Sequence, residues 1–69
     1  MAEYQFTWTD PHDGRIYEVF YDFRSEPQKA VVDYAYLAYL NGVEIKLSPE
    51  LKERMTAAAL DHRRQTQSL

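Results

Sequence analysis

The sequence predicts a small α+β domain in which an N-terminal antiparallel β-hairpin is followed by two α-helices, in the order β-β-α-α. Residues 3–9 and 15–23 have the alternation and the aromatic and β-branched content of strands, and turn-forming residues separate them. Residues 25–28 and 48–50 each have the pattern of a helix start. A chain of 69 residues has room for one domain, here residues 1–69.

The first predicted strand, EYQFTWT at residues 3–9, alternates strictly. Tyr4, Phe6 and Trp8 fall on one side and small polar residues on the other, which is typical of a half-buried strand. The stretch DPHDG follows, and Gly14 can adopt a positive φ without a steric cost. We therefore expect a tight connection to the next strand.

The second predicted strand, RIYEVFYDF at residues 15–23, has two unlike sides. One side is uniformly apolar and is predicted to face the core: it comprises Tyr17, Val19, Tyr21 and Phe23. The other side mixes apolar residues with acids: Ile16, Glu18, Phe20 and Asp22. Phe20, Tyr21 and Phe23 are expected to join the hairpin to the first helix.

The segment from Lys29 to Leu40 has two interpretations. Ser25 as N-cap, Gln28 as its capping-box partner and Pro27 in the first turn favour a helix. Gly42 would then follow the helix as its C′ residue, and Val31, Tyr34, Ala35 and Ala38 would close the core. Alternatively, Asn41-Gly42 is a two-residue turn between the strands YAYLAYL and VEIKL, which gives a four-stranded protein. We prefer the helix.

A second helix is predicted from Ser48-Pro49-Glu50, which supplies a cap, a proline at the first position and an acid near the positive end of the dipole. It is expected to run to about Arg64 after a short extended VEIKL segment, with residues 65–69 as a frayed tail. Its apolar stripe comprises Leu51, Met55, Ala58, Ala59 and His62, and Leu60 falls on the opposite face.

The number of tyrosines favours a protein-interaction surface. Six tyrosines exceed what a core of this size is expected to enclose, and tyrosine is enriched at protein interfaces. If residues 29–40 form a helix, one side of this helix remains apolar after the core is closed. This predicts an apolar patch that is covered by another protein or by a second copy. The predicted partner-binding residues are Asp33, Tyr36, Leu37, Tyr39, Leu40 and Leu60.

Charge is distributed unevenly. Residues 1–44 carry eight acidic and three basic side chains, a formal charge of −5, whereas residues 45–69 carry five basic and three acidic ones, a charge of +2. The acidic part would steer a basic partner. The basic helix supports an alternative function, nucleic-acid binding through Lys52, Arg54, Arg63 and Arg64. An acidic surface that mimics nucleic acid and blocks a nucleic-acid enzyme is a further alternative.

The sequence offers no pattern of catalytic residues. It has no cysteine, no G-x-S-x-G elbow, no glycine-rich phosphate loop and no H-E-x-x-H motif. Asp10, His12 and Asp13 are close enough in sequence to suggest a metal site, but the same residues are what a hairpin turn needs. His62 is predicted to lie at the boundary of the packed stripe. We expect neither catalysis nor a metal or cofactor.

The prediction for function is a small non-enzymatic adaptor or inhibitor that binds a larger protein and self-associates. The absence of cysteine, of a signal peptide and of a long apolar run favours the cytoplasm. Short, acidic, cysteine-free interaction proteins are common among bacterial and phage accessory proteins, an analogy of size and composition alone.

Overall fold

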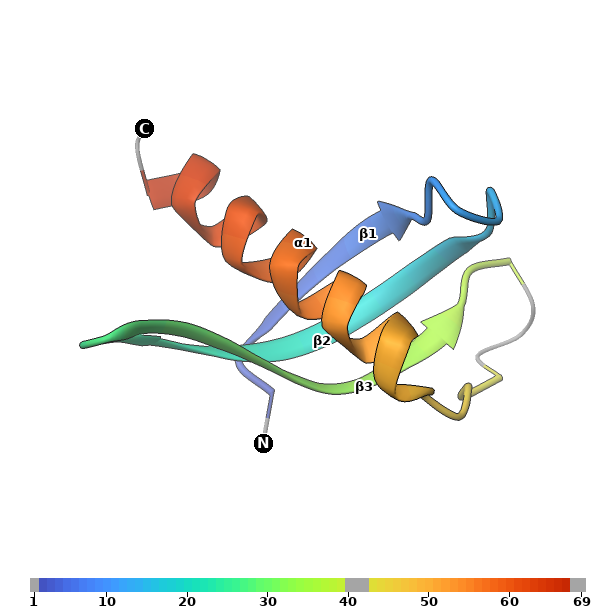
Figure 1. Cartoon of the computed structure of the whole chain (residues 1–69), viewed down its shortest axis with the longest axis horizontal. Coiled ribbons are helices and arrows are strands. Elements are labelled where there is room, and N and C mark those ends of the chain that lie inside the picture. The colour runs from blue at the N-terminus through green and yellow to red at the C-terminus, as the bar shows by residue number, and fades with distance from the viewer. Residues whose placement is uncertain (1, 40–42, 68–69) are drawn as a thin grey trace.

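In the described residues, three antiparallel strands and one helix make up the fold (Figure 1). The computed structural model describes residues 2–39 and 43–67. The strands β1 (Tyr4–Thr9), β2 (Ile16–Ser25) and β3 (Gln28–Leu37) form a sheet in the order β1-β2-β3, and α1 (Pro49–Gln67) crosses one face of it. The α+β class is confirmed. The β-β-α-α order is wrong, because the segment predicted as the first helix is a strand.

The first hairpin is confirmed. β1 and β2 pair with Tyr4 opposite Tyr21, Phe6 opposite Val19 and Trp8 opposite Tyr17, so the apolar sides of both strands lie on the same face. The connecting turn closes with two main-chain bonds, from Asp10 N to Arg15 O (2.8 Å) and from Gly14 N to Asp10 O (2.7 Å). Gly14 has a φ of 74°, the conformation for which glycine is suited.

Ser25 does not cap a helix. It pairs with Gln28 across a tight turn of Glu26 and Pro27, whose peptide bond is cis, and the chain returns as β3. The β-branched and aromatic content of this segment therefore prevailed over its capping signal. Beyond the last residue paired with β1, the β2–β3 hairpin continues as a two-stranded arm (Figure 1).

A register shift in the β2–β3 pair explains why β3 resembles a helix in sequence. Phe20 pairs with Tyr34 and Tyr21 with Val32, so Asp33 is an extra residue in β3. Before this bulge Ala30 and Val32 face α1, and after it Ala35 and Leu37 do so. The alternation changes phase once, which makes the segment look apolar on all sides.

The VEIKL segment pairs briefly with the outer edge of β3. Leu37 N donates to Val43 O (3.1 Å), Ile45 N donates to Ala35 O (3.0 Å), and Glu44 forms a bridge with Tyr36. The alternative hairpin prediction therefore contained part of the fold. Leu40, and the Asn41-Gly42 pair expected to form a turn or a helix end, lie outside the described residues.

Helix α1 begins where the sequence predicts. Ser48 Oγ accepts a hydrogen bond from Leu51 N (3.2 Å), and Pro49 is the first helical residue. The helix continues through Gln67, past the predicted end at Arg64 and into the segment expected to be a frayed tail. Leu60, predicted on the outer face, is partly buried and packs against the core.

The core lies between the sheet and α1. The buried apolar residues come from β2, β3 and α1: Tyr17, Val19, Tyr21, Ala30, Val32, Ala35, Met55 and Ala59. Two tyrosines are thus core residues. Of the residues expected to close the core from a first helix, Ala35 does so, whereas Val31 is 39% exposed and Tyr34 lies on the other face of the sheet.

Met55 provides a test of this packing. It is fully buried beneath the sheet, so Met55→Ala is expected to lower the free energy of unfolding by about 2–5 kcal/mol through lost burial and a residual cavity. Urea denaturation followed by far-UV circular dichroism measures the change. Lys52→Ala, at an exposed position of the same helix, is the control. Equal stability of the two variants would contradict the placement of α1.

Candidate protein-interaction surface

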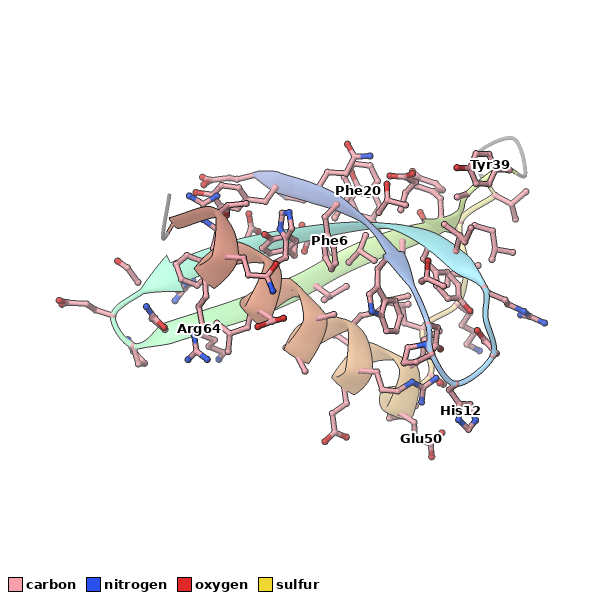
Figure 2. The ribbon with its side chains drawn as sticks, turned by 90° about the horizontal axis from the view of Figure 1, so that it is seen from above. Phe6, His12, Phe20, Tyr39, Glu50 and Arg64 are labelled. Atoms are coloured by element: carbon pink, nitrogen blue, oxygen red, sulfur yellow. The ribbon has the colours of Figure 1, made fainter. Side chains whose placement is uncertain are left out.

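An aromatic cluster lies on the face of the sheet opposite α1. The rings of Phe20 and Tyr34 stack with centroids 4.8 Å apart, and Tyr36 meets both edge-on, at 5.7 Å from Phe20 and 5.5 Å from Tyr34. We call Phe20, Tyr34 and Tyr36 the open-face cluster. Each ring is half-buried, and α1 covers the other side of the sheet (Figures 1 and 2).

Two carboxylates flank the open-face cluster. Glu18 pairs with Tyr36 from the β2 side, and Glu44 pairs with it from the other side. Directly opposed residues of antiparallel strands point to the same face and lie roughly 5 Å apart at Cβ. Tyr36 therefore lies between two acids in one row across the sheet.

The carboxylate of Glu18 is held in place by β1. Gln5 Nε2 donates to its Oε2 (2.8 Å), and Thr7 Oγ1 donates to its Oε1 (3.0 Å). Both donors are neutral, so they orient the carboxylate without forming an ion pair with it. An oriented carboxylate beside aromatic faces suits a cation, a guanidinium above all.

The structure separates the five described residues among the six predicted to bind a partner. Tyr36 belongs to the open-face cluster, whereas Leu37 and Leu60 pack on the core side. Asp33 is exposed at the bulge, Tyr39 is 87% exposed with a φ of 68°, and Leu40 lies outside the described residues. The grouping assumed a helix, which places residues 33, 36, 37 and 40 together. In a strand, neighbours 36 and 37 point to opposite faces.

Phe20, Tyr34 and Glu18 were not among the predicted site residues, and Glu44 was expected only as one of the acids that would steer a basic partner. The signal for two of them was present, because Glu18 and Phe20 share the side of β2 that was not assigned to the core. Tyr34 and Glu44 depend on the register of β3 and on the bridge to it. Local sequence does not reveal those pairings.

Three of the four basic residues proposed to contact nucleic acid make contacts within the fold. Arg54 Nη2 lies 2.9 Å from Asp10 Oδ2, the guanidinium of Arg63 lies over the Tyr4 ring at 4.3 Å, and Arg64 Nε donates to Gln28 Oε1 (3.0 Å). Arg64 thereby ties the last turns of α1 to the β2–β3 arm (Figure 2). Lys52 lies at an exposed position of α1.

The carboxylates of the predicted turn, considered as metal ligands, serve the structure instead. Asp10 is 0% exposed, with Oδ1 accepting from His12 N (2.9 Å) and Oδ2 paired with Arg54. Asp13 accepts bonds from Arg15 N (2.8 Å) and from Tyr17 Oη (3.3 Å). Within residues 2–39 and 43–67, no group of three His, Asp or Glu side chains is arranged to hold a metal ion.

His62 lies inside an aromatic group between β1, β2 and α1. Its ring stacks on Phe6 with centroids 4.7 Å apart, and its Nδ1 is 2.8 Å from Tyr21 Oη. Burial raises the pKa of Tyr21, as it does that of Tyr17. The boundary position predicted for His62 is confirmed by its half-buried state.

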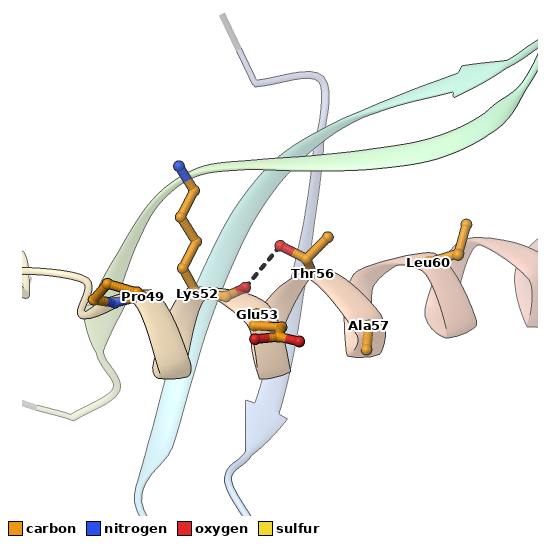
Figure 3. Close-up of a pocket in the computed structure, with 6 residues that line it drawn as sticks. All are labelled: Pro49, Lys52, Glu53, Thr56, Ala57 and Leu60. Atoms are coloured by element: carbon orange, nitrogen blue, oxygen red, sulfur yellow. Dashed lines mark hydrogen bonds between the residues drawn. The ribbon is translucent and has the colours of Figure 1, made fainter.

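The outer side of α1 has a shallow hollow, shown in Figure 3. Its lining comes from one helix alone, and Thr56 Oγ1 there bonds to the carbonyl of Lys52 (2.7 Å). A surface formed by a single helix does not enclose a ligand, so this hollow lacks the concave polar arrangement of a small-molecule site.

Comparisons of the chain with protein-family models, with curated proteins and with solved structures found no match. None of the helical segments within the described residues has the length and apolar character needed to cross a membrane.

The Asp10–Arg54 pair predicts that the stability of the fold decreases at acidic pH. The hydrogen bond from Arg54 holds the pKa of Asp10 below its ordinary value. Because the unfolded chain, with a pKa of about 3.9, binds this proton more readily, the pair's contribution is present above that pH and is lost as the pH falls through the lowered pKa of the folded state.

Asp10→Asn is therefore expected to unfold at lower urea concentration at neutral pH and to lose less further stability on acidification than the wild type. Urea midpoints measured at a series of pH values check this. Glu26→Gln, exposed in the β2–β3 turn, should keep the wild-type profile. An unchanged profile in Asp10→Asn would show that another group controls the acid response.

Proposed function

We propose that this protein is a non-enzymatic protein-interaction module whose open sheet face binds a basic segment of a larger protein, as an adaptor or inhibitor in the cytoplasm. One observation carries the proposal. The open-face cluster of Phe20, Tyr34 and Tyr36 lies on a sheet face that no helix of the described residues covers, with Glu18 and Glu44 beside it.

The chemistry of this face suits arginine. An aromatic face attracts a guanidinium by about 0.5–1 kcal/mol at exposed sites and more when the contact excludes water. A carboxylate beside the ring adds a charge-assisted hydrogen bond. With Tyr36 between Glu18 and Glu44, one guanidinium can lie on the ring and reach a carboxylate at the same time.

Long-range charge favours the same partner. Residues 1–44, the part of the sequence that contains β1, β2 and β3, carry a formal charge of −5. A field of this sign raises the association rate of a basic segment and opposes the approach of nucleic acid to the open-face cluster. The internal contacts of Arg54, Arg63 and Arg64 also favour protein over nucleic acid as the partner.

Binding fits this face better than catalysis does. The oriented carboxylate of Glu18 lies on an open surface with neutral donors, where water is not excluded. A catalytic site needs a positioned reacting group in an environment that shields it from bulk water.

The test uses a synthetic arginine-containing peptide and its citrulline counterpart, titrated by isothermal calorimetry. Tyr36→Ala and Glu18→Gln are each expected to weaken arginine-peptide binding by about 5- to 30-fold, through loss of the cation–aromatic contact or of the charge-assisted bond. The citrulline peptide, which lacks the charge, should bind the wild type weakly.

Glu53→Gln is the matched control, because it removes the same charge from an exposed position of α1 on the other side of the sheet. If Glu53→Gln weakened peptide binding equally, the effect would be due to net charge alone, which would contradict a defined site. Tyr36→Ala unfolding by circular dichroism would assign Tyr36 a structural role. Tight binding of a short single-stranded DNA, and not of the peptide, would favour the alternative function, nucleic-acid binding through the basic helix.

A further inference from the structure

A groove of about 290 Å³ lies between the outer edge of the sheet and the second half of α1. Three successive residues of β1, residues 6–8, form one wall of the groove. The other wall is a single face of α1, because Ala58, Asp61, His62 and Gln65 are spaced by three, one and three residues. Stacking of Phe6 on His62 (4.7 Å) forms part of its base.

The wall formed by β1 is a free strand edge. Asp10 N donates to Arg15 O, which directs the main-chain groups of Asp10 toward the β2 side. Hydrogen-bonding direction alternates along an antiparallel strand. The groups of Tyr4, Phe6 and Trp8 therefore face β2, and those of residues 5, 7 and 9 face outward. In the part of the chain that the structure describes, no other segment bonds to the outward groups.

β3, the other edge strand, differs in this respect. Its main-chain groups at Ala35 and Leu37 are bonded by residues 43–45, and a bulge interrupts it at Asp33. β1 has none of the usual protections, since Tyr4–Thr9 contains no charged residue and no proline and pairs with β2 without a register shift. Exposed edges of this kind pair readily with another strand.

We infer that the β1 edge is a strand-addition site, at which an extended segment of another protein pairs with β1 and lays alternate side chains into the groove beside α1. Main-chain bonds to residues 5, 7 and 9 would provide affinity, and the groove would select side chains at every second position. Asp61, at an exposed position in the α1 wall, favours a basic side chain there.

A segment of another protein fits this groove better than a second copy of β1 does. Two copies paired along β1 would bring two chains of charge −3 together, with an Asp61 beside each groove. The partner strand would also present its own Phe6 and Trp8 to a groove that these residues already line. A basic segment with smaller apolar residues meets neither difficulty.

The first measurement is amide hydrogen exchange of the free protein by NMR. The amides of Gln5, Thr7 and Thr9 are expected to exchange quickly, while those of Phe6 and Trp8, bonded to β2, exchange slowly. Slow exchange at Gln5, Thr7 and Thr9 that disappears on dilution would overturn the inference, because a second copy would then occupy the edge.

The binding probe is a synthetic peptide taken from a phage-displayed random-peptide library selected on the immobilised protein. Its binding can be followed by the fluorescence of Trp8, the single tryptophan, which lines the groove. The peptide is expected to slow exchange at Gln5, Thr7 and Thr9. Failure to enrich any peptide, or protection confined to the open-face cluster, would overturn the inference and leave the proposed function standing.

Two variants at one residue separate the main-chain bond from the side chain. Thr7→Pro removes an N–H that points away from β2, so the β1–β2 ladder keeps its bonds. Thr7→Ala retains that N–H and removes the γ-methyl group and the hydroxyl that contacts Glu18. Thr7→Pro should therefore bind the peptide about tenfold or more weakly than Thr7→Ala, which lacks the same hydroxyl but keeps the main-chain N–H.

Equal affinity of Thr7→Pro and Thr7→Ala for the peptide would overturn the inference. If Thr7→Pro does not fold, the inference is tested instead by the peptide affinity of Asp61→Asn and by the amide exchange pattern of the wild type. Asp61→Asn is expected to weaken the binding of a basic peptide several-fold. Unchanged affinity of this variant, together with no slowing of amide exchange on β1, would overturn the inference.

Discussion

One helix can cover only one face of a three-stranded sheet, and the rest of the structure follows from this constraint. α1 packs over the side that carries Tyr17, Val19 and Tyr21, and no second layer covers the opposite side of β2 and β3 in the described part of the chain. Instead, the half-buried rings on that side pack against one another, since the centroids of Phe20 and Tyr34 stack 4.8 Å apart. Contiguous apolar faces of this kind are typical of sites where proteins associate.

The position of α1 depends on contacts at both of its ends. Near its start, Arg54 reaches the buried carboxylate of Asp10, which also organises the β1–β2 turn. Near its end, Arg63 lies on the Tyr4 ring and Arg64 bonds to Gln28 at the tip of the β2–β3 arm. Three of the four basic residues that suggested a nucleic-acid surface thus join the helix to the β1–β2 turn, to β1 and to the β2–β3 arm.

The sequence predicted correctly those elements in which apolar residues recur with one constant spacing. β1 and β2 alternate without interruption over their paired length, and Met55 and Ala59 lie at helical spacing on the buried side of α1. β3 was assigned to a helix because the bulge at Asp33 changes the phase of its alternation and removes the periodic signal. Ser25, Pro27 and Gln28 then supplied a capping pattern that a hairpin turn also satisfies.

The candidate site was predicted in kind but not in position. A Tyr-rich acidic surface was expected, and Tyr36 belongs to one, yet its neighbours are set by pairing across strands. Glu18 and Glu44 are 26 residues apart in sequence and reach Tyr36 from two sides only through the β2–β3 register and the bridge beyond it. Local patterns specify which residues alternate within a strand, whereas register between strands depends on the whole packed sheet.

The two proposed surfaces meet at Thr7. Its hydroxyl holds the carboxylate of Glu18 on the open face, while its main-chain N–H points to the free edge of β1. A strand added to that edge would extend the row of Thr7, Glu18, Tyr36 and Glu44 by one residue. Side chains of the added strand alternate between the groove and the open face. A basic residue on the open face would then lie beside Glu18, so a single extended basic segment can use the edge for affinity and the acidic aromatic row for selectivity.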